Sequence, residues 1–282
     1  MQLRDHGDPR AFLAAARPLL ERDEARHNLA FGICATLVAA PETHPEFHLW
    51  TVADDSVVAA ALLTPPFNLW VAQPVRADAL EFLARELAAT EAEPPGVTAA
   101  LPEADRFAEA WEQLRPRRRR LVRAQGIYKV ESPRLPAGVP GRMRAATATD
   151  RELLVDWFDA FGREALGPDS ARHAAAETVA RRLAGRGAGI AIWEDGRPAS
   201  CAGFGGETPN GIRIGPVYTP SELRGRGYAS ALTAELSRQL LAEGRRYCFL
   251  YTDLANPTAN RIYVNIGYVR VCDSAEYVFE PA

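Results

Sequence analysis

A glycine-rich turn between a strand-like run and a helix-like run constrains this chain most. The turn spans Arg224–Ala229 and follows an apolar run over residues 212–219. After it, Leu232, Leu236 and Leu240 recur on one stripe, as in an amphipathic helix. The pattern predicts a strand, a glycine-rich loop and a helix, in that order.

The start of such a helix is suited to an anion. Backbone N–H groups in the first turn have no partner within the helix, and the helix dipole adds positive potential there. Gly225 and Gly227 allow the backbone to approach a ligand closely. Arg224 and Arg226 add positive charge and bidentate donors. A phosphate or pyrophosphate is therefore the expected ligand.

A second pattern begins at Asn256. This residue suits an N-cap, Pro257 suits the first helical position, and Gly267 suits the helix end. Asn256, Ala259 and Tyr263 share one helical face because of their spacing. That face presents a polar group, a small residue and a phenol.

Together the two patterns resemble the signature of the GNAT superfamily of N-acetyltransferases. The family's Q/R-x-x-G-x-G/A motif is similar to Arg224, Gly227 and Ala229. The family's downstream motif is similar to the second pattern, at Asn256, Ala259, Tyr263, Gly267 and Tyr268. The resemblance covers roughly residues 142–282.

The resemblance implies that acetyl-CoA is the co-substrate and lies where two strands, 212–219 and 245–253, splay apart. Backbone groups near Val217 and Thr219 would pair with the pantetheine arm, and an N–H near Val217 would polarise the thioester carbonyl. Amides of residues 225–230 would hold the pyrophosphate. The implied cofactor-binding residues are Val217, Thr219, Arg224, Gly225, Arg226, Gly227, Tyr228, Ala229, Ser230 and Asn256.

By the same resemblance Tyr263 is the catalytic acid, which gives a proton or a hydrogen bond to the departing thiolate. A phenol with an ordinary pKa of about 10 is protonated at neutral pH. An acceptor amine would attack the thioester directly, because binding both substrates in one cleft supplies proximity. The base stays open among Glu207, Glu222, Asp253 and a water chain. Glu207 is slightly favoured because it ends a neighbouring strand.

Two functions follow from these residues. The first is an acetyl-CoA-dependent N-acyltransferase acting on an amine of a small molecule or a protein. The alternative is a non-catalytic CoA-binding sensor or interaction module on the same fold. Tyr263 and the complete loop favour the enzyme, whereas the absence of an evident base leaves the sensor open. The loop lacks the patterns of nucleotide triphosphatases and of dinucleotide-binding folds.

Composition narrows the class of protein further. A net charge of −3 argues against general nucleic-acid binding. No apolar run reaches the roughly 20 residues that span a bilayer, and no signal-peptide core is seen at Met1. The four cysteines are far apart and show no metal spacing, so we expect reduced thiols in a cytoplasmic protein and no metal. The oligomeric state is left open.

The order of elements is similar in the two halves of the chain. Each half predicts helices, antiparallel strands, then a helix, a strand and a helix. We therefore predict an α+β fold with a GNAT-like mixed, mostly antiparallel sheet flanked by helices, in two units in tandem. Three prolines and two glycines mark residues 132–141 as a linker, between a degenerate domain (1–131) and an acetyltransferase domain (142–282).

The first half lacks the glycine-rich loop. At the corresponding place, residues 72–77 read AQPVRA, and Pro74 has no N–H. We expect this half not to bind a pyrophosphate in the same way. Its role would be structural, or it would form part of the wall of the substrate site.

Several local features are also predicted. The first half starts helical, over residues 9–21 and 23–38, and a terminal hairpin is expected over 268–272 and 276–279. The expected helix caps are Asp8, Asp23, Thr149 or Asp150, and Ser170.

Overall fold

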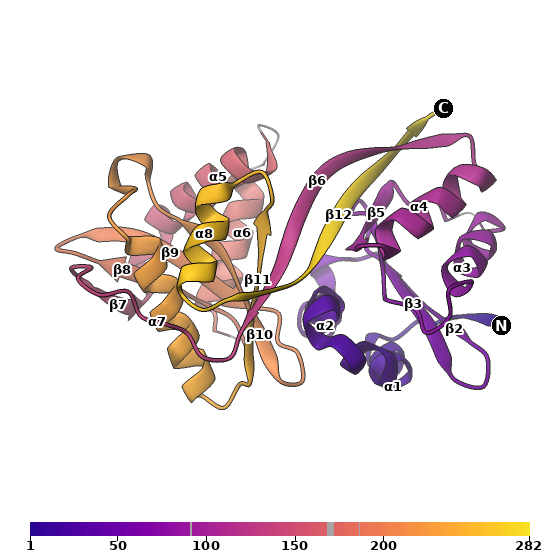
Figure 1. Cartoon of the computed structure of the whole chain (residues 1–282), viewed down its shortest axis with the longest axis horizontal. Coiled ribbons are helices and arrows are strands. Elements are labelled where there is room, and N and C mark those ends of the chain that lie inside the picture. The colour runs from indigo at the N-terminus through magenta and orange to yellow at the C-terminus, as the bar shows by residue number, and fades with distance from the viewer. Residues whose placement is uncertain (91, 168–171, 186) are drawn as a thin grey trace. The chain divides into compact units, whose positions relative to one another are not determined.

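A computed structural model describes residues 1–90, 92–167, 172–185 and 187–282. The chain forms two compact units (Figure 1). Unit 1 comprises Met1–Ile127, Tyr251–Asn256 and Arg270–Ala282, and unit 2 comprises Tyr128–Leu250 and Pro257–Val269. Each unit has a mixed, mostly antiparallel sheet with helices on both faces, which confirms the predicted fold class.

Unit 1 is built from the first half of the chain and the last strand. Its elements are β1 (Gln2–Asp5), α1 (Pro9–Leu20), α2 (Glu24–Ala39), β2 (His48–Ala53), β3 (Val57–Leu63), β4 (Leu69–Val71), α3 (Ala79–Ala88), β5 (Gly96–Ala100), α4 (Glu103–Leu114), most of β6 (Arg117–Val130) and most of β12 (Val269–Pro281). The strand order is β1-β2-β3-β4-β5-β12-β6. Helices α1 and α2 cover one face of the sheet, while α3 and α4 cover the other.

The two predicted N-terminal helices are confirmed. Asp8 and Asp23 cap them, because their carboxylates accept the backbone N–H groups of Arg10 and Arg26, each at 3.1 Å. The prediction missed β1, which precedes α1 and pairs antiparallel with β2.

The C-terminal strand corrects one prediction. Residues from Val269 to Pro281 form one continuous strand, not a hairpin. This strand pairs antiparallel with β5, from Ser274 opposite Ala100 to Val278 opposite Gly96. Strand β5 supplies a partner over the middle of the run, β6 is its other neighbour in the sheet, and no glycine interrupts it. The end of the predicted domain 142–282 therefore belongs to unit 1.

Unit 2 carries the glycine-rich loop and the helix of the second pattern, whereas Asn256, the first residue of that pattern, falls in unit 1. Its elements are β7 (Arg142–Ala145), α5 (Arg151–Leu166), α6 (Arg172–Leu183), β8 (Gly189–Glu194), β9 (Pro198–Gly205), β10 (Gly211–Tyr218), α7 (Tyr228–Ala242), the first part of β11 (Tyr247–Asp253) and α8 (Pro257–Asn265). The strand order is β11-β10-β9-β8-β7. Among the described residues of unit 2, β10 and β11 pair in parallel and the other neighbouring strands pair antiparallel. Helices α5 and α6 cover one face and α7 covers the other.

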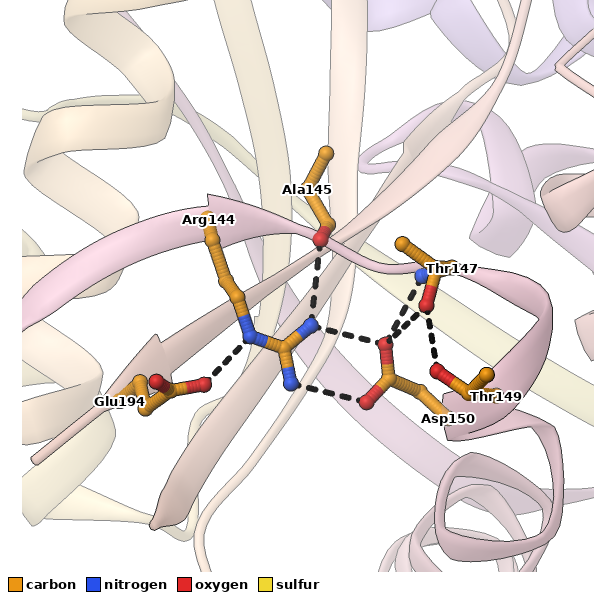
Figure 2. A network of polar contacts seen from close by, with 6 residues as sticks. All are labelled: Arg144, Ala145, Thr147, Thr149, Asp150 and Glu194. Carbon is orange, nitrogen blue, oxygen red and sulfur yellow. Dashed lines mark hydrogen bonds and ion pairs between the residues drawn. The ribbon is translucent and has the colours of Figure 1, made fainter. Parts of the chain in front are cut away.

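A polar network fixes the start of α5 against the sheet edge (Figure 2). Arg144 of β7 donates two hydrogen bonds of 2.8 Å to the Asp150 carboxylate and also pairs with Glu194 of β8. Asp150 in turn accepts the Thr147 N–H at 2.8 Å in a capping box. The Arg144 guanidinium lowers the pKa of Asp150 to about 2. The predicted cap Ser170 lies outside the described residues.

Candidate active site

A β-bulge shapes the strand that leads to the glycine-rich loop. Ile214 of β10 lies opposite Phe204, and Val217 lies opposite Ala202. Gly215 and Pro216 therefore stand against a single residue of β9. Such a bulge bends its strand and strengthens the local twist.

The parallel pairing of β10 with β11 ends just before this bulge. The parallel pairing joins residues 211–213 to residues 247–249, while β10 continues to Tyr218. The sequence prediction placed a cofactor cleft at this divergence. The predicted residue Val217 lies in the diverging stretch. The Thr219 hydroxyl follows it and lies 2.9 Å from the Ser200 hydroxyl, and the Thr219 carbonyl accepts a hydrogen bond from Arg224 at 2.9 Å.

The loop after β10 depends on its two glycines. Gly225 and Gly227 have φ angles of 77° and 84°, in the left-handed region that favours glycine. A Cβ on Gly225 would have no atom within 4 Å, whereas one on Gly227 would lie 2.9 Å from Val139 Cγ2. The backbone at Gly225 is therefore open to a ligand, and Gly227 holds the loop against the protein.

Gly227 also begins α7 as its N-cap. The first helical hydrogen bond runs from the Ala231 N–H to the Gly227 carbonyl at 3.0 Å. The amides of Tyr228, Ala229 and Ser230 precede that bond, so the helix itself gives them no acceptor. These three N–H groups and the helix dipole form the predicted anion-binding element.

The two predicted arginines differ in their surroundings. Arg224 donates to both Glu164 oxygens at 2.7 and 3.0 Å and to the Thr219 carbonyl at 2.9 Å. Arg226 is exposed and makes a long contact of 3.5 Å with the Glu222 carbonyl. Within the described residues Arg226 has no carboxylate partner. Glu164 was not predicted, and it comes from α5, about sixty residues before the motif.

The side chain of Tyr228 faces the core. It is buried against the strands, and its hydroxyl donates to Asp195 at 2.7 Å. Tyr228 can therefore offer a ligand only its backbone. Its phenol instead ties the start of α7 to the turn between β8 and β9.

Tyr263 presents a free phenol on α8. Its ring packs on the core of unit 2, with its centroid 6.0 Å from that of Tyr268. Among the described residues no group forms a hydrogen bond with its hydroxyl. Burial raises the pKa of Tyr263 to about 12, so the phenol keeps its proton at neutral pH. Asn256, the remaining predicted residue, is exposed and directly precedes α8.

Comparisons with known proteins agree with this geometry. Residues 205–278, which include every predicted site residue, match the FR47-like protein family. A GCN5-related N-acetyltransferase from Sphaerobacter thermophilus is 18% identical, with a TM-score of 0.63 over 98% of this chain and 94% of that chain. The chain has a GNAT N-acetyltransferase fold.

Other solved structures extend the likeness over nearly the whole chain. A tandem GNAT protein from the clavulanic acid biosynthesis pathway is 15% identical, with a TM-score of 0.60 over 99% of this chain and 98% of that chain. A Drosophila protein is 12% identical, with a TM-score of 0.71 over 99% of this chain and 98% of that chain. A comparison with curated protein sequences finds no match. The GNAT fold suggests acyl transfer.

The candidate bases all have other partners. Glu207 forms an ion pair of 2.6 Å with Arg245. The carboxylate of Asp253 accepts the Ala255 N–H at 2.8 Å, and Glu222 is exposed beside the Ser221 hydroxyl at 3.3 Å. The geometry of this GNAT fold therefore favours none of the three as the base.

The corresponding loop of unit 1 uses its amides internally. Pro74 has no N–H, and its neighbours donate within unit 1: Ala72 to Ala60 at 2.8 Å, Gln73 to His27 at 3.1 Å, and Val75 to Val58 at 2.8 Å. These contacts occupy the amides of Ala72, Gln73 and Val75. That the first half binds no pyrophosphate there stays a prediction.

No helix among the described residues combines the length and apolarity needed to cross a membrane. No three His, Cys, Asp or Glu side chains in that part of the chain are grouped to hold a metal ion.

Proposed function

We propose that this chain is an acetyl-CoA-dependent N-acyltransferase that transfers an acetyl group to an amine within a ternary complex. The observation that carries the proposal is the end of β10. There the parallel pairing with β11 ends, the strand bends at a bulge, and the chain enters a loop with two left-handed glycines at the start of α7. This arrangement combines an extended backbone for a pantetheine arm with amides for a pyrophosphate.

The residues of the loop fit the cofactor's charge. Three helix-start amides supply donors, and Arg226 adds a positive charge that no carboxylate of the described residues neutralises. The space around Gly225 allows a close approach to the backbone. In this proposal Arg224 exchanges Glu164 for the anion.

Acetyl-CoA supplies an activated acyl thioester when bound. The backbone around Val217 and Thr219 orients the pantetheine arm, and an N–H near Val217 stabilises the charge that develops on the acyl oxygen. Tyr263 donates its phenolic proton to the thiolate that leaves as the N–C bond forms and the C–S bond breaks. The attacking amine gives its proton to water, because the three candidate carboxylates have other partners.

The test of this proposal is release of CoA thiol in the presence of a broad panel of amines. We expect turnover by the wild-type chain and a fall in kcat of about 10²- to 10⁴-fold in Tyr263→Phe, with acetyl-CoA affinity unchanged. Tyr247→Phe is the matched control, since it removes a phenol from the start of β11 and should turn over normally. Equal rates for Tyr263→Phe and wild type would exclude Tyr263 as the acid.

The ion pair between Glu207 and Arg245 favours a second candidate, a CoA-binding sensor without chemistry. A sensor would bind acetyl-CoA but release no CoA thiol with any amine in the panel. That result would replace the enzyme proposal.

A further inference from the structure

Arg182 of α6 lies directly over the bulge between β9 and β10. A Cβ on Gly203 would be 1.9 Å from Arg182 Nη1 and 3.1 Å from the Gly215 carbonyl oxygen. Only a glycine at position 203 leaves room for the guanidinium there. The cation is thereby held beside Gly215, two residues before Val217.

This guanidinium has no acidic partner among the described residues. Its polar contact is a long one, 3.4 Å from Nη1 to the Phe204 carbonyl, and its other neighbour is the Phe158 ring at 5.8 Å. Burial, together with the like charges of Arg213 and Arg181, lowers the pKa of Arg182 to about 9. A cation removed from water is costly unless an anion pairs with it.

The other arginines around this part of unit 2 are different. Four of them form ion pairs with carboxylates: Arg144, Arg172, Arg224 and Arg245. Arg182 differs from these four because the described residues give its guanidinium no carboxylate partner, and it lies beside the predicted acyl position.

We propose that Arg182 binds the carboxylate of the acceptor, so that the acceptor is a small amino carboxylic acid. This inference rests on the proposed function and deepens it by naming the substrate class. A guanidinium matches a carboxylate with two parallel hydrogen bonds. Gly215 and Val217 are only two residues apart on β10. A carboxylate bound by Arg182 and an amine that reacts near Val217 can therefore belong to one small molecule.

The experiment compares amino acids with their carboxamides, which keep the amine and remove the negative charge. Ligand-induced thermal shifts and kcat/KM are measured for both series with wild type, Arg182→Gln and Arg181→Gln. We expect wild type to prefer the acid by about 10- to 100-fold, the value of a charge-assisted hydrogen bond. Arg182→Gln should reduce this ratio to about one, while Arg181→Gln, the exposed neighbour on α6, should keep it.

Unchanged acetyl-CoA affinity in Arg182→Gln shows that the variant is folded. Equal preference for the acid in Arg182→Gln and wild type would overturn the inference, and so would the absence of any amino acid that binds wild type. Binding of amino acids that depends on Arg182, without CoA release, would sink the proposed acyl transfer and leave the carboxylate site standing.

Discussion

His27 provides a sharp test of the packing in unit 1. Its imidazole is buried in α2, with Nδ1 2.9 Å from the Leu20 carbonyl oxygen and Nε2 accepting the Gln73 N–H at 3.1 Å. The ring is therefore neutral, with its proton on Nδ1. A second proton would have to lie between Nε2 and the Gln73 N–H, where no acceptor is present.

The size of the effect follows from the pKa. Burial lowers the pKa of His27 from 6.5 to about 4, and the side chain is only 1% exposed, so solvent screens it little. The unfolded chain takes up this proton below pH 6.5, whereas the folded chain resists it until about pH 4. The contribution of His27 to the free energy of unfolding should thus be fully present above pH 6.5 and be lost as the pH falls toward 4. The loss is about 2 kcal/mol between pH 7 and pH 5 and about 3 kcal/mol in full.

The assay is urea unfolding at pH 7, 6 and 5. His27→Gln keeps a neutral donor and acceptor for Leu20 and Gln73 but cannot take up the proton. Its stability should therefore fall by about 2 kcal/mol less than that of wild type over this range. His173→Gln is the control, since His173 is exposed in α6 and should leave the wild-type slope intact.

Equal losses of unfolding free energy in wild type and His27→Gln would refute this reasoning. His6 is also buried with a lowered pKa, so the wild-type slope alone does not identify the group. The difference in this slope between wild type and His27→Gln identifies His27 as the group.

Two further predictions concern unit 2. Asp150→Asn should remove about 2 kcal/mol from the free energy of unfolding at neutral pH, because the pKa of Asp150 falls from 3.8 to about 2 in the fold. In wild type that contribution is present above pH 4 and is lost as pH falls toward 2, which acid titration of unfolding measures. Glu164→Gln should tighten acetyl-CoA binding by up to about fivefold, because it releases Arg224 from an exposed ion pair worth at most about 1 kcal/mol. Calorimetry at low salt checks this, and weaker binding by Glu164→Gln would show that Arg224 acts from its present position.

Local chemistry in the sequence predicts much of this fold. Asp8 and Asp23 are short side chains before apolar helical runs, and both form caps. Gly225 and Gly227 are needed because their backbone angles are left-handed. In contrast, β1 and the continuous β12 depend on distant partners, β2 and β5. No local pattern carries that information, so β1 was missed and β12 was predicted as a hairpin.

The candidate site divides in the same way. The loop and Tyr263 belong to short motifs and are visible in the sequence. Three other features arise from tertiary packing: the burial of the Tyr228 side chain, the ion pair between Glu164 and Arg224, and the unpaired charge of Arg182. Periodicity places these residues on helices but does not say what each one meets across the sheet.

Calorimetric titration with acetyl-CoA tests the proposed cofactor site at the start of α7. We expect micromolar binding at one site per chain by wild type, and loss of binding in Gly227→Asp, where a carboxylate would meet the pyrophosphate. Gly225→Asp places the same charge where no atom lies within 4 Å; both variants put an aspartate on left-handed backbone, so binding is compared only after folding is verified. Gly7→Asp, also in open space but in unit 1, should bind normally. Absence of binding by folded wild-type protein would contradict the account.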